Sequence, residues 1–143
     1  MSNTLDNIIL TPLRRINVKG GNVLHGLKSN EKSFKGFKEI YFSMIEENSV
    51  KAWKKHLKMT LNLIVPVGVV EFVFFDEEDH CRKEVIGNQR YLRITVPPGI
   101  WFGFKGLYYP YSLVTNIADI CHDPSEIERK LINEYNYDWG LSK

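Results

Sequence analysis

The sequence contains little of what would hold a metal ion or a disulfide framework. Of its 143 residues only two are cysteines, Cys81 and Cys121, and neither has the spacing of a metal-ligand pair. The four histidines include no pair of the H-x-H or H-x-x-x-H kind. A histidine-based metal site needs about three such side chains and a carboxylate that converge. We therefore expect no metal ion and two reduced thiols.

Long apolar runs are also missing. The longest, Leu61–Phe75, is interrupted by polar residues, a proline and a glycine, and is shorter than the roughly 20 residues of a membrane span. Residues Met1–Asp6 are polar and lack the basic region of a signal peptide. These features predict a cytoplasmic protein without a membrane partner.

Neither charge nor motif points to a nucleic acid or to a familiar catalytic loop. Nineteen Lys and Arg residues against seventeen Asp and Glu residues give a net charge of +2, so charge alone predicts no nucleic-acid partner. The sequence has no glycine-rich phosphate loop, no Ser-His-Asp order and no nucleophile elbow.

Short strand-like runs dominate what is present. Segments rich in Val, Ile, Phe and Tyr alternate with Gly, Pro, Asn and Asp, which is typical of β-strands. The predicted strands are Ile8–Leu13, Asn22–Leu27, Phe37–Met44, Val50–His56, Leu61–Val67, Val69–Asp76, Arg90–Val96, Trp101–Phe104 and Ser112–Ala118. Their close spacing favours one all-β domain over residues 1–143, a sandwich or barrel of the jelly-roll kind.

One segment predicts a helix. Asp123 can cap the segment that begins at Pro124, and Glu126 follows the cap by three residues. Apolar residues at Ile127, Leu131 and Ile132 then recur at helical spacing, so a short C-terminal helix is expected after the β domain.

The densest basic cluster covers residues 51–58. In a regular strand Lys54 and His56 share one face, whereas Lys51 lies on the other. The segment could be a solvated edge strand protected by its lysines. Alternatively it lines a cleft, where burial lowers the pKa of a lysine so that it can act as a base, and where histidine needs no such tuning.

Aromatic residues gather after the turn at residues 97–99 and near the C-terminus. Most of them are expected in the core or at a dimer interface, although Trp101 could instead stack on a base or sugar. The segment Tyr135–Trp139 could close a cleft, cover a dimer interface or pack on the domain itself.

Several motifs follow one another along the chain: Gly36-Phe37-Lys38-Glu39, Lys51-Ala52-Trp53-Lys54, Val67-Gly68-Val69-Val70 leading to Asp76, Val96-Pro97-Pro98-Gly99-Ile100-Trp101-Phe102-Gly103-Phe104 and Glu126-x-Glu128-Arg129. In their order these motifs resemble those of the dTDP-4-dehydrorhamnose 3,5-epimerase family. The resemblance spans roughly residues 36–130. The resemblance implies a cupin-like jelly-roll homodimer that acts on a dTDP-4-keto-6-deoxyhexose without a metal or organic cofactor.

The resemblance also implies roles for individual residues. Phe37 and Glu39 match positions that meet the nucleotide, and Lys51 stands where an arginine holds the diphosphate. Lys54 stands where the family has its catalytic histidine, and Thr115 falls where a catalytic tyrosine is expected. Phe102 likewise replaces a histidine of the family. The family's aspartate that orients the histidine falls near residues 133–135, where this sequence has none. Because Lys51 and Lys54 are three residues apart, both can face one cleft only if a bulge or a bend separates them, and we expect one.

These observations predict a nucleotide-sugar epimerase or isomerase of surface-polysaccharide (lipopolysaccharide) biosynthesis. It would remove a proton from the carbon next to a ketone. The candidate catalytic residues are Lys54 as base or enolate stabiliser, His56 as proton shuttle or orienting group, and Glu71 as an alternative base or as the partner of a lysine. Candidate substrate-binding residues are Phe37, Glu39, Lys51, Asn62, Trp101 and Thr115. The alternatives are a sugar 3,4-ketoisomerase and a non-catalytic cupin that binds sugar nucleotides or carbohydrates.

Overall fold

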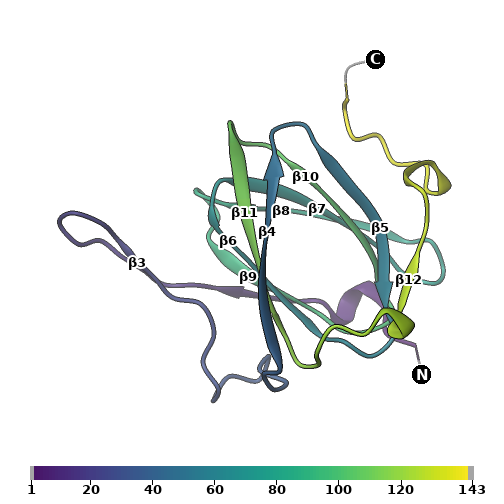
Figure 1. Ribbon diagram of the computed structural model, residues 1–143, viewed down its shortest axis with the longest axis horizontal. Helices are drawn as coiled ribbons and strands as arrows, with labels where there is room; N and C mark the ends of the chain where they lie inside the picture. The colour runs from purple at the N-terminus through teal and green to yellow at the C-terminus, as the bar shows by residue number, and fades with distance from the viewer. Residues whose placement is uncertain (1, 142–143) are drawn as a thin grey trace.

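The computed structural model describes residues 2–141 and forms a β-sandwich whose two sheets curve toward each other (Figure 1). Within these residues the strands are β1 (Ile9–Pro12), β2 (Arg15–Ile16), β3 (Val23–Leu24), β4 (Glu39–Glu46), β5 (Val50–His56), β6 (Leu61–Val67), β7 (Val69–Phe75), β8 (Cys81–Gly87), β9 (Leu92–Val96), β10 (Trp101–Gly106), β11 (Tyr111–Ala118) and β12 (Ile127–Arg129). The first sheet has the order β1-β9-β6-β11-β4 and the second β12-β5-β10-β7-β8. The paired strands are antiparallel, which confirms the all-β, cupin-like jelly roll.

The small β2–β3 hairpin stands apart from both sheets. In Figure 1 it forms an arm that extends to the left of the sandwich. The arm is tied to the rest of the chain at its base, where the Arg15 guanidinium donates to the carbonyl of Asn88 over 2.8 Å. The guanidinium also lies 5.2 Å from the centre of the Tyr91 ring.

Strand alternation places a hydrophobic core between the sheets. On β6, Leu61, Leu63 and Val65 point inward, and on β7 the inward residues are Phe72 and Phe74. Because all five are almost fully buried, this layer supplies a large part of the free energy that holds the two sheets together.

A second, aromatic cluster covers the outer face of the second sheet. Trp53 and Phe75 belong to it, together with three residues of the C-terminal segment, Tyr135, Tyr137 and Trp139. Tyr135 stacks on Phe75 with ring centres 4.0 Å apart. The C-terminal segment therefore packs on the outer face of the second sheet of the same chain, away from the space between the sheets.

The second sheet contains a bulge in β5. Phe102 of β10 pairs with Lys54, but the next residue, Gly103, pairs with Ala52, so Trp53 is an extra residue. Ala52 and Trp53 consequently both pack in the outer aromatic cluster. The predicted bulge between Lys51 and Lys54 is confirmed.

Glycine at position 103 is required by this bulge. A Cβ atom at Gly103 would lie 2.6 Å from the Cβ of Ala52 and 2.9 Å from a ring carbon of Trp53. These distances are shorter than carbon–carbon contact allows, so a larger residue would force the two strands apart.

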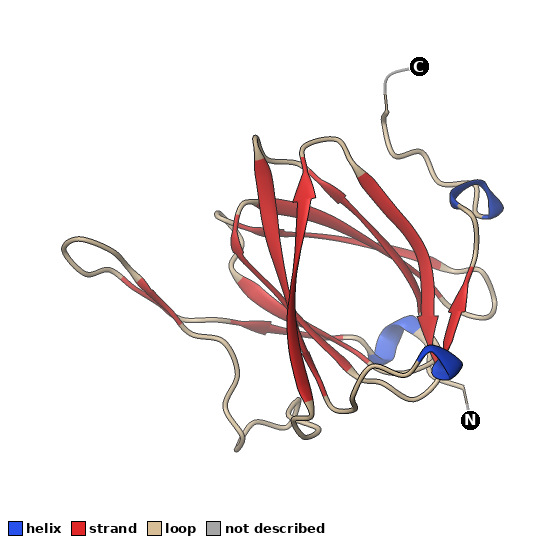
Figure 2. Ribbon diagram, viewed as in Figure 1, coloured by secondary structure: helices blue, strands red, loops and turns tan. Residues whose placement is uncertain are grey.

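Two predictions about secondary structure need correction. The C-terminal helix is reduced to separate 3-10 turns at Pro124–Glu126 and Ile132–Glu134, with β12 between them (Figure 2). The expected cap is present, since the Asp123 carboxylate accepts from the backbone N–H of Ser125. Strands β2 and β8 were not predicted, because β2 is only two residues long and β8 is a charged edge strand with few apolar residues. Across residues 2–141 no helix is both long and apolar enough to cross a membrane.

Candidate active site

A cavity of about 430 Å³ opens between the two sheets. The first sheet contributes Tyr41, Ser43, Leu61, Leu63, Val114 and Asn116 to its lining. The second sheet contributes Lys51, Lys54, His56, Phe102, Phe104 and Arg129. Its size is that of a small-molecule site, and its walls combine apolar surface with a few polar groups, as ligand pockets do.

The bulge in β5 brings three predicted site residues to this cavity. Lys54 and His56 are two residues apart and share the inner face, as alternation predicts. In a regular strand Lys51 would lie on the opposite face, but the extra residue in the bulge shifts the alternation, so Lys51 also lines the cavity. Arg129 joins them from β12, where it pairs directly with Lys54. This wall therefore carries several cationic groups and favours an anionic ligand.

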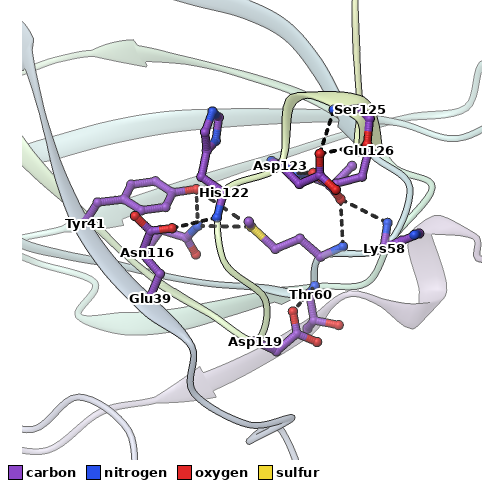
Figure 3. Close-up of polar contacts among 12 residues, drawn as sticks. Glu39, Tyr41, Lys58, Thr60, Asn116, Asp119, His122, Asp123, Ser125 and Glu126 are labelled. Carbon is purple, nitrogen blue, oxygen red and sulfur yellow. Dashed lines mark hydrogen bonds and ion pairs between the residues drawn. The ribbon is translucent and has the colours of Figure 1, made fainter.

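His56 forms a buried pair with Glu126. The imidazole Nδ1 lies 2.5 Å from Glu126 Oε2, and the two side chains are only 4% and 1% exposed. The second carboxylate oxygen accepts from the backbone N–H groups of Lys58 and Met59 at 3.0 and 2.9 Å. Figure 3 shows Glu126 at the turn that follows Asp123. This turn positions the Glu126 carboxylate beside the backbone of Lys58.

The pKa values of this pair point to a neutral imidazole beside an ionised carboxylate. Burial lowers the pKa of His56 below its ordinary value and outweighs the opposing effect of Glu126. Burial raises the pKa of Glu126, but the hydrogen bonds from His56, Met59 and Lys58 outweigh it, and the net pKa lies below the ordinary value. An ionised carboxylate only accepts, so Nδ1 carries the proton and Nε2 is left as a base.

Lys54 has a different environment from its neighbours. Within residues 2–141 its amine has no carboxylate in ion-pair range and no hydrogen-bond acceptor, whereas Lys51 donates to the carbonyl of Met44 over 3.1 Å. Burial lowers the pKa of the Lys54 amine, the nearby charges of Arg129 and Lys51 lower it further, and the opposing charge of Glu126 does not offset them. The amine is thus driven toward its neutral, nucleophilic form.

A tyrosine faces the cavity from the other sheet. Asn116 donates its side-chain N–H to the hydroxyl of Tyr41 over 2.9 Å, and this hydroxyl lies 3.7 Å from the sulfur of Met59 (Figure 3). Burial raises the pKa of Tyr41, although the hydrogen bond from Asn116 opposes it. Tyr41 is therefore protonated at neutral pH and can donate a proton from the wall opposite His56.

Six predicted site residues do not line the cavity. Glu71 and Trp101 lie on the outer face of the second sheet, because the residues beside them in sequence point inward. Glu71 accepts from the hydroxyl of Tyr137 over 2.8 Å, so it is paired with a tyrosine and not with a lysine. This placement does not support a role for Glu71 as the alternative base.

The remaining four belong to the first sheet or precede it. Asn62 and Thr115 alternate with cavity residues and point to the outer face, where Asn62 contacts Ser33 and Thr95. Phe37 is exposed ahead of β4, and the Glu39 carboxylate accepts from the backbone N–H of His122. A role for these residues toward a ligand in the cavity of the same chain is not supported by their positions.

Sequence reasoning missed several residues that the structure brings to the site. Glu126 stood out only as a capping residue, and its 70-residue separation from His56 hid the pairing. Tyr41 could have been found from the alternation of the predicted strand Phe37–Met44, which puts it on one face with Ser43. Lys130 also borders the cavity, but its amine lies 4.4 Å from the centre of the Tyr135 ring, on the outer side.

No group of three or more His, Cys, Asp or Glu side chains forms a metal-binding arrangement in the part of the chain that the structure describes. The protein combines a jelly-roll fold with a cationic cavity that holds a carboxylate-paired histidine. These features define a cupin-like protein that binds a small molecule.

Comparison with known proteins makes the assignment more specific. No family model matches the chain. The chain is similar to a dTDP sugar isomerase from Desulfovibrio desulfuricans, with a TM-score of 0.90 and 33% identity, over 96% of this chain and 94% of that one. The chain therefore belongs to the family of dTDP-sugar isomerases, which confirms the resemblance to the dTDP-4-dehydrorhamnose 3,5-epimerase group.

More distant structures share the fold. A dTDP-4-dehydrorhamnose 3,5-epimerase from Bacillus anthracis matches with a TM-score of 0.79 and 17% identity, over 100% of this chain and 90% of that one. A sugar 3,4-ketoisomerase from Thermoanaerobacterium thermosaccharolyticum matches with a TM-score of 0.75 and 17% identity, over 89% and 90%.

A curated relative from Haloferax volcanii is described as a probable low-salt glycan biosynthesis epimerase. It is 29% identical over 97 residues, a match that covers 60% of this chain. The chain spans 62% of the length of that relative in this match.

Proposed function

We propose that the protein is a sugar-nucleotide epimerase or isomerase of glycan biosynthesis. It removes a proton from the carbon next to the ketone of a dTDP-4-keto-6-deoxyhexose and returns it. The observation that carries this proposal is the His56–Glu126 pair in the cationic cavity. The substrate class is supported by the related dTDP sugar isomerase and by the glycan biosynthesis epimerase of Haloferax volcanii.

His56 acts as the base in this proposal. Its Nδ1–H is held by Glu126, so Nε2 is free to take a proton from a carbon acid in the cavity. Glu126 fixes the tautomer and stabilises the imidazolium that forms, which makes it a positioning residue. The carboxylate that the resemblance placed near residues 133–135 is thus supplied by Glu126, from the turn before β12.

The other walls supply binding and protonation. In this proposal Lys51 and Arg129, which line the cavity, hold the diphosphate, Arg129 through its planar guanidinium and Lys51 as a point charge. Tyr41 returns the proton from the opposite wall, so a hydrogen removed on one face of the sugar can be replaced on the other. Replacement on the opposite face inverts the carbon, which is epimerisation.

The test is proton NMR of the full chain with dTDP-4-keto-6-deoxyglucose in D2O. Loss of the signal of carbon 3 or carbon 5, or appearance of a new sugar isomer, supports the proposal and identifies the carbon. Movement of the ketone to the neighbouring carbon identifies a 3,4-ketoisomerase. Binding without exchange contradicts the enzymatic proposal and favours the non-catalytic sugar-nucleotide cupin.

The proposal includes a homodimer and a cytoplasmic location. On β4, Ile40, Phe42 and Met44 point away from the cavity and are 44%, 61% and 55% exposed, so they form an apolar strip that a second copy can cover. Cys81 and Cys121 are exposed free thiols, as expected in a reducing compartment. Light scattering during size-exclusion chromatography tests the dimer, and Phe42→Glu should convert it to a monomer.

A further inference from the structure

Lys54 stands out among the cavity residues because it has a base beside it and no partner of its own. Its amine faces the cavity on the same side of β5 as His56, two residues along the strand. Within the described residues it meets neither a carboxylate in ion-pair range nor a hydrogen-bond acceptor. A partly buried amine without a counter-ion is an unusual arrangement, because burial of the charged form is costly.

The neighbouring lysine on the outer face shows what a structural lysine in this strand looks like. Lys55 lies 2.8 Å from Glu77 and 3.6 Å from Glu128, and its amine also sits 5.1 Å from the centre of the Trp101 ring. Burial lowers the pKa of Lys55, but its two carboxylate partners outweigh burial and raise the net pKa. Lys55 is therefore held as a cation.

The surroundings of Lys54 act in the opposite direction. Arg129 of β12 lies opposite Lys54 in the register of the β12–β5 pair, and Lys51 faces the same cavity. Two cations beside a third, partly desolvated amine favour its neutral form, which is how amines in proteins are made nucleophilic. A neutral amine in a cavity that holds a ketone can attack the carbonyl carbon.

We infer that Lys54 forms a protonated imine with the ketone of the substrate, so that the reaction proceeds through covalent catalysis. This inference rests on the proposed function and names the electrophile at that site. The resulting cationic nitrogen withdraws electrons from the neighbouring C–H bond more strongly than the ketone does. Lys54 is then a catalytic residue, and His56 is the base that acts on the activated carbon.

The steps balance without an oxidant or another co-reactant. The Lys54 nitrogen adds to the carbonyl carbon, and the carbonyl oxygen takes up one proton from the amine and one from solvent. It then leaves as water, which gives the protonated imine. His56 takes the neighbouring proton, and the C–H electron pair forms an enamine. Return of a proton to carbon, followed by addition of water and release of the amine, gives the product ketone and restores Lys54.

The experiment traps the imine in the full-length protein. The protein is incubated with dTDP-4-keto-6-deoxyglucose and sodium cyanoborohydride, which reduces a protonated imine faster than a ketone. Intact mass and peptide mapping then locate the adduct. We expect one sugar adduct per chain, on Lys54, in the wild type and in the matched control Lys55→Met.

Two variants separate covalent from purely electrostatic action. Lys54→Arg keeps a positive charge but cannot form an imine, and Lys54→Met keeps much of the side-chain volume. Both should lose the adduct and slow substrate proton exchange by about 10³-fold or more, while circular dichroism shows an intact fold. His56→Gln should keep the adduct and lose exchange, since it removes the base and not the amine.

The outcomes distinguish this inference from the proposed function. If the wild type exchanges substrate protons but forms no adduct, and Lys54→Arg exchanges within tenfold of the wild type, the imine inference is overturned. The proposed epimerase or isomerase function then still stands. Absence of any exchange in the wild type overturns the proposed function. In that case an adduct confined to Lys54 still supports imine formation, and its absence overturns both.

Discussion

The two faces of β5 place the same kind of residue in opposite environments. On the outer face, Lys55 is paired with Glu77 and Glu128, and the strand packs through Trp53 into the aromatic cluster. On the inner face, Lys54 has cations beside it and an open cavity in front. The comparison teaches that the chemistry of this strand follows from which face each residue occupies. Strand alternation separates Lys54 from Lys55, and the bulge brings Lys51 to the inner face.

The strongest test of the inner face is loss of its base. His56→Gln removes the proton acceptor that Glu126 holds in place, so substrate proton exchange should fall by about 10²- to 10⁴-fold. Binding of thymidine diphosphate should stay unchanged, because the cations that hold it remain. Isothermal titration calorimetry and NMR exchange measure the two effects. Exchange within tenfold of the wild type would remove His56 from the mechanism.

A second test addresses how Glu126 acts through His56. Glu126→Gln leaves a side chain that can still accept from the backbone of Met59, but it removes the negative charge beside the imidazole. The rate should fall by about 10²-fold, because the tautomer is no longer fixed.

The pH profile separates this role from a merely structural one. The rate requires neutral His56, so it falls as pH drops through the His56 pKa, which lies below its ordinary value. Glu126 raises the His56 pKa, so its removal should shift the acid limb to still lower pH. A lower rate with an unshifted acid limb would contradict the positioning role.

The bulge itself is tested by Gly103→Ala. The added methyl group would overlap Ala52 and the Trp53 ring, so we expect a loss of about 1–3 kcal/mol in the free energy of unfolding. Gly26→Ala is the matched control, because its new Cβ would meet only the end of Ile64 at 3.5 Å. Urea unfolding measures both variants. Equal stability of the two would mean that the bulge tolerates a side chain.

Much of this arrangement could be predicted where local pattern decides it. The predicted bounds of β5 and β6 match the structure, and those of β6 follow from its apolar and β-branched residues. Alternation alone puts Lys54 and His56 on one face. The bulge that adds Lys51 was expected only because the resemblance gave that residue a role at the same site.

Other parts depended on contacts that a sequence does not display. Glu126 was recognised as part of a cap, but its partner His56 lies 70 residues away. Glu71 was predicted as a base because it interrupts an apolar run. In β7, however, Phe72 and Phe74 point inward, so alternation places Glu71 on the outer face. The outer face was itself hard to foresee, because the C-terminal residues around Tyr135 bury it.

The smallest expected effect concerns the outer face. Lys55→Met removes the ion pairs with Glu77 and Glu128, but the Lys55 side chain is 11% exposed and its partners are 51% and 50% exposed. Pairs with solvent-exposed partners contribute little, so the free energy of unfolding should fall by about 1 kcal/mol or less. Because Lys55 points away from the cavity, proton exchange on the substrate should equal that of the wild type. Urea unfolding and NMR exchange on one preparation measure both quantities, and a large loss of exchange would show that the two faces of β5 are coupled.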